Sequence, residues 1–515
     1  MLSQFTDETI SLMKDAMQSP KDGESLLAKT GFTQPSTAVT GLQGYMLEGP
    51  AKHLYPVITP LRNVIPRVND GFSTQANWKA ILSPDSTLEF PGVSEGNRAR
   101  SLTPTVADYN AVFKGFGYEH KATFEAQYAG RTYEDIQAVM RLEALQAAMV
   151  GEEFAILGGN GSVVGTALGQ ANTPVGTLKT TTGSMSAQAT ACYVIGLTLA
   201  GLRSSLGTGA TAWAYTSSTA TYLPTASGAV VKVAFTRTNE DASTDTIKPG
   251  HGQMSAEASP LITTTSTSLG VDWVVAPKKG EIAWAWYTGA TSAAACSLTA
   301  ITTVPIFKQR LDAVATQKAN ATDLNVDESQ DTLMYDGILT QIFNGGYYKT
   351  GLSLTATGAG GVTELDDFFQ YEFDVNRLTN FRIYCNSRDR IGISRLIMGN
   401  GTANSAVRLT VPEGPGQIDL TANTVVSGYH NPVDGSVMPI TVHPYLPAGT
   451  ILIKSEGPLP YPQADVPNVW QIRNRQEYYS IDWPRTSRKY QIGVYWDGVL
   501  QGYFPSGNGI IQLAA

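Results

Sequence analysis

A long apolar run at helical spacing, followed by a cluster of glycines, constrains the fold of this chain more than any other feature. The run covers 132–158, and Gly158, Gly159, Asn160 and Gly161 end it. Thr132 and Asp135 predict an N-cap, and the glycine cluster predicts a left-handed C-cap. The helix would have about 25 residues and a length of about 38 Å, more than a compact domain needs. Seven apolar residues share its expected face: Ile136, Val139, Met140, Leu142, Leu145, Met149 and Ile156.

The composition indicates a folded protein with many turns. The 515 residues exceed one ordinary domain, and a hydrophobic content of 42% argues against wholesale disorder. The 50 glycines and 27 prolines indicate a structure rich in strands and loops. The net charge is −8, with no long run of like charges. This balance disfavours a protein that condenses nucleic acid, which needs a basic surface.

The cysteines and the apolar segments indicate a soluble protein that is not exported. Cys192, Cys296 and Cys385 are odd in number and far apart, so they predict buried reduced thiols rather than disulfides or a zinc site. Residues 1–16 are charged and contain no continuous apolar core of a signal peptide. The most apolar window, 191–202, is shorter than the roughly 20 residues of a membrane-spanning helix.

The first part of the chain divides into three segments before and around the helix. Residues 1–65 carry little core of their own and predict an extended arm. Residues 66–125 predict a long hairpin, with an outgoing strand at 78–82 and a return strand at 112–124. Residues 126–179 contain the helix.

The composition changes at 180–305, where Thr, Ser, Ala and Gly dominate. This segment predicts an inserted all-β sandwich domain, for which an immunoglobulin-like shape is one option. Its core is expected to come from alternating apolar residues: Val231, Val233, Phe235, Ile282, Trp284 and Trp286. The alternative is that these strands enlarge a neighbouring domain.

The last two segments predict an α/β layer and a final set of strands. Within 306–455 we expect a helical run from Lys308, a helix from Thr363, a strand at 381–385 and a helix at 388–398. Within 456–515 we expect strands, with Asp497 and Gly498 as a type I′ hairpin turn. The fold class is therefore α+β.

Several short motifs occur in an order that resembles a known family. Glu153 to Ser162 reads E-x-A-I-L-x-G-x-G-S, and the stretches 59–63 and 65–68 precede it. The later stretches are 426–429, 438–440, 443–447, 449–452 and 478–484. Together they resemble the major capsid proteins of tailed double-stranded DNA bacteriophages, whose fold is named after phage HK97.

This resemblance implies a domain layout. Residues 1–65 would be the N-terminal arm, 66–125 the E-loop, and 126–179 the spine helix with part of the P-domain. Residues 180–305 would be the inserted sandwich, 306–455 the A-domain, and 456–515 the closing P-domain strands.

The resemblance also implies partners and a location. Copies of the chain would form pentamers and hexamers of an icosahedral virion shell, assembled in the host cytoplasm. Portal, scaffolding or decoration proteins would be further partners. The acidic balance suits a shell that encloses DNA without sequence-specific binding.

Three motifs that mimic functional sites are explained better as structure. The spacing of Gly159, Gly161 and Gly165 resembles a dinucleotide loop, but it closes a helix instead of opening one. The series Asp323, Asn325, Asp327 starts like a calcium loop, but Glu328 replaces the required glycine and Met334 the required glutamate. Gly92-x-Ser94-x-Gly96 has the spacing of a nucleophile elbow, but it lies in a predicted loop tip.

The titratable residues form no catalytic pattern either. His53, His120, His251, His430 and His443 are dispersed. Glu152 and Glu153 are helix neighbours that point in different directions, so they are not expected to converge. A basic group is expected to make salt bridges between subunits, with contact to enclosed DNA as the alternative: Arg473, Arg475, Arg485, Arg488 and Lys489.

The prediction is thus a structural protein with no catalytic, cofactor-binding or metal-binding residue. Some proteins of the resembled family crosslink through an E-loop lysine, and Lys79 lies in the matching region. Neither the asparagine nor the glutamate of that reaction can be assigned here. Two rival functions remain, an encapsulin-type compartment and a β-rich carbohydrate-binding adhesin or tail protein.

Overall fold

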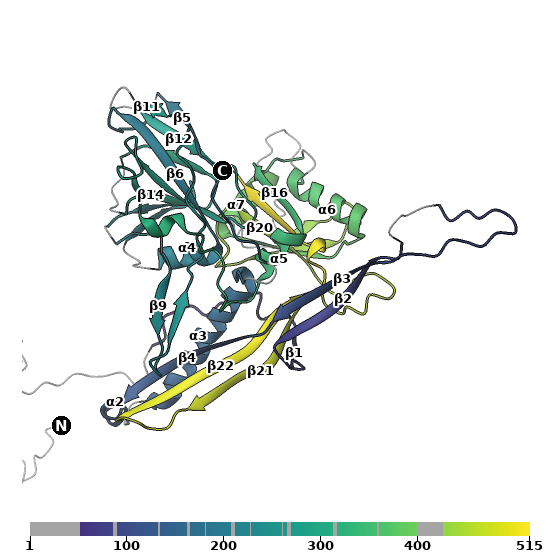
Figure 1. Ribbon diagram of the computed structural model, residues 1–515, viewed down its shortest axis with the longest axis horizontal. Coiled ribbons are helices and arrows are strands. Elements are labelled where there is room, and N and C mark those ends of the chain that lie inside the picture. Colours follow the sequence, from purple (N-terminus) through teal and green to yellow (C-terminus); the bar gives the residue numbers. More distant parts are fainter. Residues whose placement is uncertain are drawn as a thin grey trace, which may run out of the picture.

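The computed structural model describes residues 52–514, except 86–89, 132–133, 162–164, 181, 208–211, 227, 260, 265–268, 313–316, 358–359 and 399–425. Most of the predicted arm and Thr132 therefore lie outside the described residues. The chain is a mixture of helices and strands, as predicted. A long helix and a long sheet form its base, and a β-rich region and an α/β region stand above them (Figure 1). A two-stranded hairpin projects from the base (Figure 1).

The predicted long helix is α3, Ile136–Gly158. The Asp135 carboxylate caps it by accepting hydrogen bonds from the amides of Gln137 and Ala138. The residues buried in the first turns of α3 differ from the apolar face that was predicted. Small and flexible residues at a spacing of four face the sheet, namely Met140, Ala144 and Ala148. The predicted face is wrong at Leu142, which is exposed, because the large side chains filling this interface come from the sheet.

The glycines at the end of α3 let other chain segments pack closely against the helix, and they do not form a left-handed turn. Gly159 has φ −58° and ψ 136°, so the predicted left-handed C-cap is wrong. A Cβ on Gly159 would lie 2.3 Å from the carbonyl oxygen of Tyr335, and one on Gly158 would lie 2.4 Å from Leu199. Neighbouring chain segments therefore pack directly on the helix end because no side chain intervenes.

The base sheet has the order β1–β21–β22–β4. Its bounds are Arg67–Val68 for β1, Trp470–Asp482 for β21, Lys489–Gly502 for β22 and Lys114–Thr123 for β4. Asp497 and Gly498 lie inside β22, so the predicted hairpin turn is wrong. Gly498 pairs with Asn474 beside an irregularity of β21, and a Cβ there would lie 2.5 Å from Asn474 Oδ1. Close cross-strand packing, not a turn, explains this glycine.

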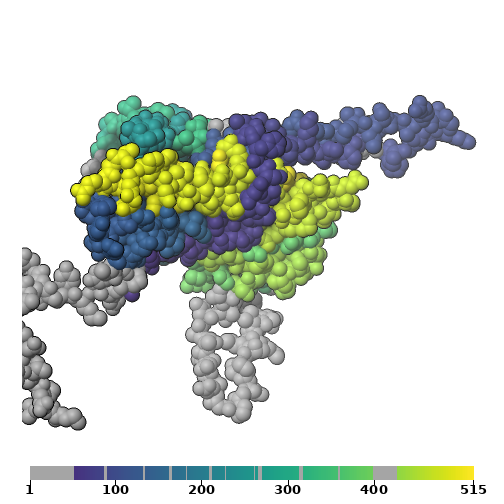
Figure 2. Space-filling model, turned by 90° about the horizontal axis from the view of Figure 1, so that it is seen from below, coloured from purple at the N-terminus to yellow at the C-terminus, as the bar shows by residue number. Residues whose placement is uncertain are grey.

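The projecting hairpin consists of β2, Gln75–Ser83, and β3, Thr105–Val112. The predicted outgoing strand is confirmed, but the predicted return strand is wrong. The strand that returns is β3, whereas β4 joins the base sheet and Phe124 begins helix α2, Phe124–Gly130. The hairpin extends well beyond the body of the molecule (Figure 2).

Two sheets face each other in the β-rich region. The larger has the order β11–β6–β13–β14–β8–β7 and the smaller β15–β12–β5. In the larger sheet, β11 is Ile262–Thr263, β6 is Ala189–Leu197, β13 is Ala283–Gly289, β14 is Ser297–Thr302, β8 is Thr221–Pro224 and β7 is Trp213–Thr216. In the smaller sheet, β15 is Ile306–Gln309, β12 is Gly270–Val274 and β5 is Val175–Lys179. Trp284 and Trp286 of the larger sheet share one core with Trp273 and Phe307 of the smaller. The region also holds α4, Leu199–Leu206, and a ribbon of β9, Phe235–Thr238, with β10, Thr244–Ile247.

The apolar residues predicted as one core in this region are divided among several. Trp284 and Trp286 lie between the two sheets, whereas Val231 packs on the opposite face of the larger sheet. Ile282 joins the main core near α3, and Phe235 is exposed on the ribbon. The alternating apolar pattern correctly predicted that Trp284 and Trp286 are buried in a core between two sheets. Such a pattern does not predict which part of the chain covers each face of a strand.

The α/β region is a six-stranded sheet with helices. Its order is β16–β23–β20–β17–β19–β18. The strands are β16, Tyr347–Leu352, β23, Gly509–Leu513, β20, Thr450–Ser455, β17, Phe381–Cys385, β19, Val437–Val442, and β18, Gly428–His430. The helices are α5, Ile338–Gly345, α6, Thr363–Asn376, and α7, Ser387–Met398. The predicted elements at 363, 381–385 and 388–398 are confirmed, whereas the helical run predicted from Lys308 is wrong, because Lys308 lies in strand β15.

No helix in the part of the chain described here is long and apolar enough to cross a membrane.

We predict that Ala148→Leu destabilises the fold by about 1–3 kcal/mol, because Ala148 is fully buried against Val494 and Trp496 of β22. The adjacent Ala147 is exposed and serves as the matched control. Ala147→Leu should change the stability by less than about 0.5 kcal/mol. Urea unfolding of both variants measures the difference, and equal effects would contradict the packing described for α3.

Glu372 of α6 makes the stability depend on pH. Its side chain is buried and accepts a hydrogen bond from Asn376 Nδ2, and burial raises its pKa from 4.5 to about 7. The folded state therefore holds this proton more tightly than the unfolded state. Its stabilising contribution is complete below about pH 4.5 and is lost as the pH rises through about 7.

We predict that Glu372→Gln removes this loss, because glutamine stays neutral. The stability of the variant relative to the native protein should rise by roughly 3 kcal/mol at most between about pH 5 and pH 8. Thermal unfolding at several pH values measures this trend. A relative stability that does not change with pH would contradict the assignment.

Candidate functional site

Two consecutive glutamates in the last turns of α3 form the centre of a buried polar network. Glu152 and Glu153 are both fully buried. As the helix geometry predicted, their carboxylates point to different partners. Each carboxylate also joins parts of the chain that are distant in sequence, which was not predicted. No sequence signal marked this role, because the partners lie between 85 and 326 residues away along the chain.

The Glu152 carboxylate binds cationic and phenolic groups. Its Oε2 accepts hydrogen bonds from Arg62 Nε at 2.8 Å, from Arg67 Nη2 and from the Tyr478 hydroxyl. Both guanidinium groups also lie over the Tyr478 ring, at 5.1 and 5.6 Å from its centroid. Burial and the adjacent Glu152 carboxylate raise the pKa of Tyr478, so its hydroxyl stays protonated and donates. Glu152 thus ties the segment before β1 to strand β21.

The Glu153 carboxylate binds the backbone of the same segment. Its Oε1 accepts from the Leu61 amide at 2.9 Å and from His443 Nε2 at 2.6 Å, and its Oε2 accepts from the Arg62 amide at 2.7 Å. The turn at 59–65 is held in addition by Leu61 and Ile65, which are buried in the main core. Glu153 therefore connects this turn to α3 and to the α/β region at once.

The network is balanced in charge and positions chain segments. The two arginines, Arg62 and Arg67, both pair with Glu152, and together they match the charges of Glu152 and Glu153. His443 Nδ1 accepts a hydrogen bond from the Tyr445 amide at 3.2 Å, so the ring proton lies on Nε2 and is donated to Glu153. Carboxylates that accept from amides and guanidinium groups fix geometry. This arrangement joins four parts of the chain and does not resemble an acid–base pair facing a substrate.

The motifs that mimic functional sites have structural roles. Asp327 accepts hydrogen bonds from the amides of Gly169 and Ser329. Ser94 is in an exposed part of the hairpin tip, and its Oγ accepts from Asn97 Nδ2 at 2.6 Å. Gly165 donates its amide to Asp336 at 3.3 Å. Among the described residues, no group of His, Cys, Asp and Glu side chains is arranged to hold a metal ion.

The basic residues near the C-terminus mostly have partners within the chain. Arg473 pairs with Asp70 at 3.0 Å, Arg475 with Asp497 at 2.5 Å and Arg488 with Glu125 at 2.6 Å. Arg485 lies over the Tyr490 ring at 4.3 Å. These three bridges hold the base of the molecule together, and the salt bridges expected between subunits stay a prediction. Lys79 pairs with Asp108 at 3.6 Å on the exposed hairpin.

The cysteines are buried and free, as predicted. Burial raises the pKa of Cys296 and of Cys385 to about 12. Thiols in this state are poor nucleophiles. They act as small apolar groups of the cores that contain them.

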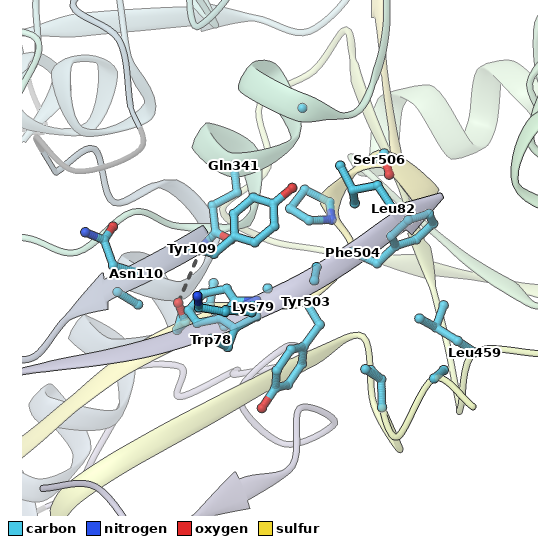
Figure 3. A pocket seen from close by; sticks show the side chains of 18 of the residues that line it. Trp78, Lys79, Leu82, Tyr109, Asn110, Gln341, Leu459, Tyr503, Phe504 and Ser506 are labelled. Atoms are coloured by element: carbon cyan, nitrogen blue, oxygen red, sulfur yellow. Dashed lines mark hydrogen bonds between the residues drawn. The ribbon is translucent and has the colours of Figure 1, made fainter. Parts of the chain in front are cut away.

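A groove of about 1110 Å³ lies at the root of the hairpin (Figure 3). Aromatic side chains form its floor: Trp78 stacks on Tyr109 with 5.7 Å between ring centroids and meets Tyr503 edge-on at 5.6 Å. Leu459, Phe504 and the end of α6 line the other side. Lys79, Asp465 and several amides add polar groups to its rim. Aromatic groups with a polar rim are typical of surfaces that bind another protein segment.

No protein-family model matches the chain, and no curated protein matches it. Several solved structures share low similarity with it. A cyanophage A-1(L) capsid chain is 9% identical with a TM-score of 0.42, covering 92% of this chain and 98% of that chain. A capsid chain of a native GTA particle is 10% identical with a TM-score of 0.39, covering 92% and 96%. A capsid chain of Myoviridae phage XM1 is 7% identical with a TM-score of 0.37, covering 91% and 96%.

We predict that Glu153→Ala destabilises the protein by about 3–5 kcal/mol, because it leaves two buried amides and His443 without their acceptor. Glu143→Ala on the same helix is the matched control, since Glu143 makes a half-exposed pair with His120. Its effect should be about 0–1 kcal/mol. Denaturant unfolding of both variants tests this, and a small effect of Glu153→Ala would show that the network does not hold the fold.

Proposed function

We propose that this chain is a major capsid protein of a tailed double-stranded DNA bacteriophage, and that it acts by assembling into a closed shell. The observation that carries the proposal is the hairpin β2–β3, which leaves the body and exposes apolar side chains along its length. A two-stranded hairpin is marginally stable by itself in water. It is therefore expected to lie on another molecule.

The exposed apolar residues of the hairpin indicate where that contact would be. Phe90 is 92% exposed near the tip, Ile81 is 72% exposed on β2, and Leu102 is 65% exposed on the return side. Large side chains at such exposure mark an interaction site when they gather on one projection. In the resembled family this part of the chain is the E-loop, which overlaps the next subunit.

The groove at the hairpin root is a suitable acceptor for the tip of a neighbouring copy. The tip points away from the body, so the hairpin cannot fill the groove of its own chain (Figure 2). When the hairpin tip of one copy lies in the groove of the next copy, the two copies form a head-to-tail contact. Repeated contacts of this kind close into rings when the rotation between copies is suitable. Such rings would be the pentamers and hexamers of an icosahedral shell.

The proposed layout follows the segments of the sequence. Residues 1–65 act as the arm, 66–125 as the E-loop, and 126–179 as the spine helix with part of the P-domain. The insert 180–305 decorates the exterior, although its strands in the fold extend over 175–309. Residues 306–455 form the A-domain at the capsomer centre, and 456–515 close the P-domain.

The shell is proposed to be part of the virion, assembled in the host cytoplasm, and to have no enzymatic activity. Its partners are further copies of itself, with portal, scaffolding or decoration proteins in addition. The net charge of −8 suits a wall that encloses DNA without binding a particular sequence. The buried network at Glu152 and Glu153 contributes a rigid subunit, because it fixes the last residues of the arm, Leu61 and Arg62.

Electron microscopy and sedimentation of the purified chain test the proposal. We expect capsomers or closed shells, either from the chain alone or with a scaffolding partner. A compact monomer under all these conditions would overturn it. Shells that contain enzymes instead of DNA would favour the encapsulin alternative, and glycan binding by a monomer would favour an adhesin.

We predict that Phe90→Ser reduces assembly at least tenfold while the fold remains intact, because the side chain is exposed and contacts little of its own chain. Ser101→Ala in the same tip is the matched control, since it changes an exposed residue without removing apolar surface. The assembled fraction from sedimentation gives the effect. Normal assembly of the Phe90 variant would remove the hairpin tip from the contact.

A pair of introduced cysteines tests the acceptor. Phe90→Cys and Gln463→Cys should crosslink between copies under mild oxidation, because Gln463 is an exposed residue of the groove rim. The native cysteines are buried and should stay reduced. Assembly without this crosslink would place the tip elsewhere on the neighbour.

A further inference from the structure

Two cations of the α/β region share one carboxylate. Arg382 of β17 and Lys454 of β20 are direct partners in the antiparallel pairing of these strands. Directly paired residues project from the same face of a sheet, with their Cβ atoms roughly 5 Å apart. Arg382 Nε lies 3.0 Å and Lys454 Nζ lies 3.4 Å from the same oxygen, Glu456 Oε1. Two positive charges and one negative charge leave a net charge of +1 in this cluster.

The excess charge of this cluster is largely withdrawn from water. The Lys454 side chain is 6% exposed, whereas those of Arg382 and Glu456 are 28% and 18% exposed. Burial lowers the pKa of Lys454, and the neighbouring Arg382 charge acts in the same direction. A buried positive charge without a matching anion is unfavourable. The cluster therefore favours a further negative group, which can approach along the exposed parts of Arg382 and Glu456.

The cluster also contains hydrogen-bond donors that lack acceptors. Arg382 Nε is close to Glu456 Oε1 but is not aligned with it, and neither atom has a well-formed hydrogen bond within the described chain. The Tyr384 hydroxyl is buried and likewise has no partner among the described residues. Tyr384 follows Arg382 by two residues in β17, so its side chain lies on the same face of the sheet. Burial and the Glu456 carboxylate raise the pKa of Tyr384, so its hydroxyl keeps its proton and can donate.

We propose that this cluster binds one oxyanion, a carboxylate or phosphate group, between Arg382, Lys454 and Tyr384. Its oxygens accept hydrogen bonds from the guanidinium, the ammonium and the phenol, and its charge balances the second cation. Guanidinium and ammonium groups are the usual partners of such anions in proteins. A water molecule would accept the same hydrogen bonds but leave the charge unbalanced. The site goes beyond the proposed shell function and does not depend on it.

Unfolding of the full, unassembled chain in rising concentrations of inorganic phosphate tests the proposal. A ligand that binds only the folded state shifts the unfolding equilibrium by about tenfold for each tenfold rise in its concentration above the dissociation constant. Phosphate also stabilises proteins in general, because it is excluded from their surfaces. The decisive quantity is therefore the difference between the native chain and its variants. Acetate, titrated in the same way, shows whether a carboxylate source, such as a neighbouring copy, fits the site as well as free phosphate.

Three variants separate binding at this site from the general effect. Tyr384→Phe keeps the ring but removes one donor, so about ten times more phosphate should be needed for the same stabilisation. Its stability without phosphate should change little, because the hydroxyl has no partner within the described chain. Lys454→Met removes the excess charge, so this chain should fold and lose the site-specific response. Lys349→Met is the matched control, since Lys349 is an exposed lysine of β16 in the same sheet, and its loss should leave the response intact.

Two results would overturn the proposal. Equal stabilisation of the native chain and all three variants by phosphate would leave only the general exclusion of phosphate from the protein surface. A loss of stability in Tyr384→Phe that is the same with and without phosphate would show that the hydroxyl serves the fold alone. Neither result depends on whether the chain assembles into a shell.

Discussion

The carboxylate of Glu153 holds the architecture together, because it accepts hydrogen bonds at once from two parts of the chain that are far apart in sequence. The amides of Leu61 and Arg62 approach it from one side and His443 from the other. A buried carboxylate with fewer partners would be strongly unfavourable. The three bonds therefore make the position of the turn at 59–65 a condition of folding α3 into this core.

The base of the molecule depends on small residues where long elements cross. Ala144 and Ala148 let α3 lie close to β22, and Trp496 fills the remaining space between them. Phe116 of β4 stacks on Trp496 with 5.0 Å between ring centroids. Gly158 and Gly159 extend this close packing to the end of the helix. The result is a stiff rod on a twisted sheet, which suits a subunit that must keep its shape among many neighbours.

The hairpin and its groove contrast with this rigid base. The base is stabilised within the chain, since even its arginines pair with acidic groups of the same chain. The hairpin keeps its apolar side chains exposed, and an aromatic groove lies at its root. A subunit whose base has its charges paired and whose hairpin exposes apolar side chains is suited to assembly. This contrast supports the proposed shell protein over an enzyme or an adhesin.

Elements with local signals could be predicted from the amino-acid sequence alone. The helix to Gly158, the helix from Thr363 and the strand at Phe381–Cys385 follow from periodicity and capping, and the order of short motifs pointed to a capsid protein. Tertiary structure decided what depends on partners. Asp497 and Gly498 resemble a turn, but pairing with both β21 and β4 keeps them in a strand. Helix geometry predicted only that the side chains of Glu152 and Glu153 diverge, whereas their partners at 62, 67, 443 and 478 make them the buried centre of the fold. Contacts across hundreds of residues leave no local pattern, because hydrogen bonding between distant segments depends on how the chain packs.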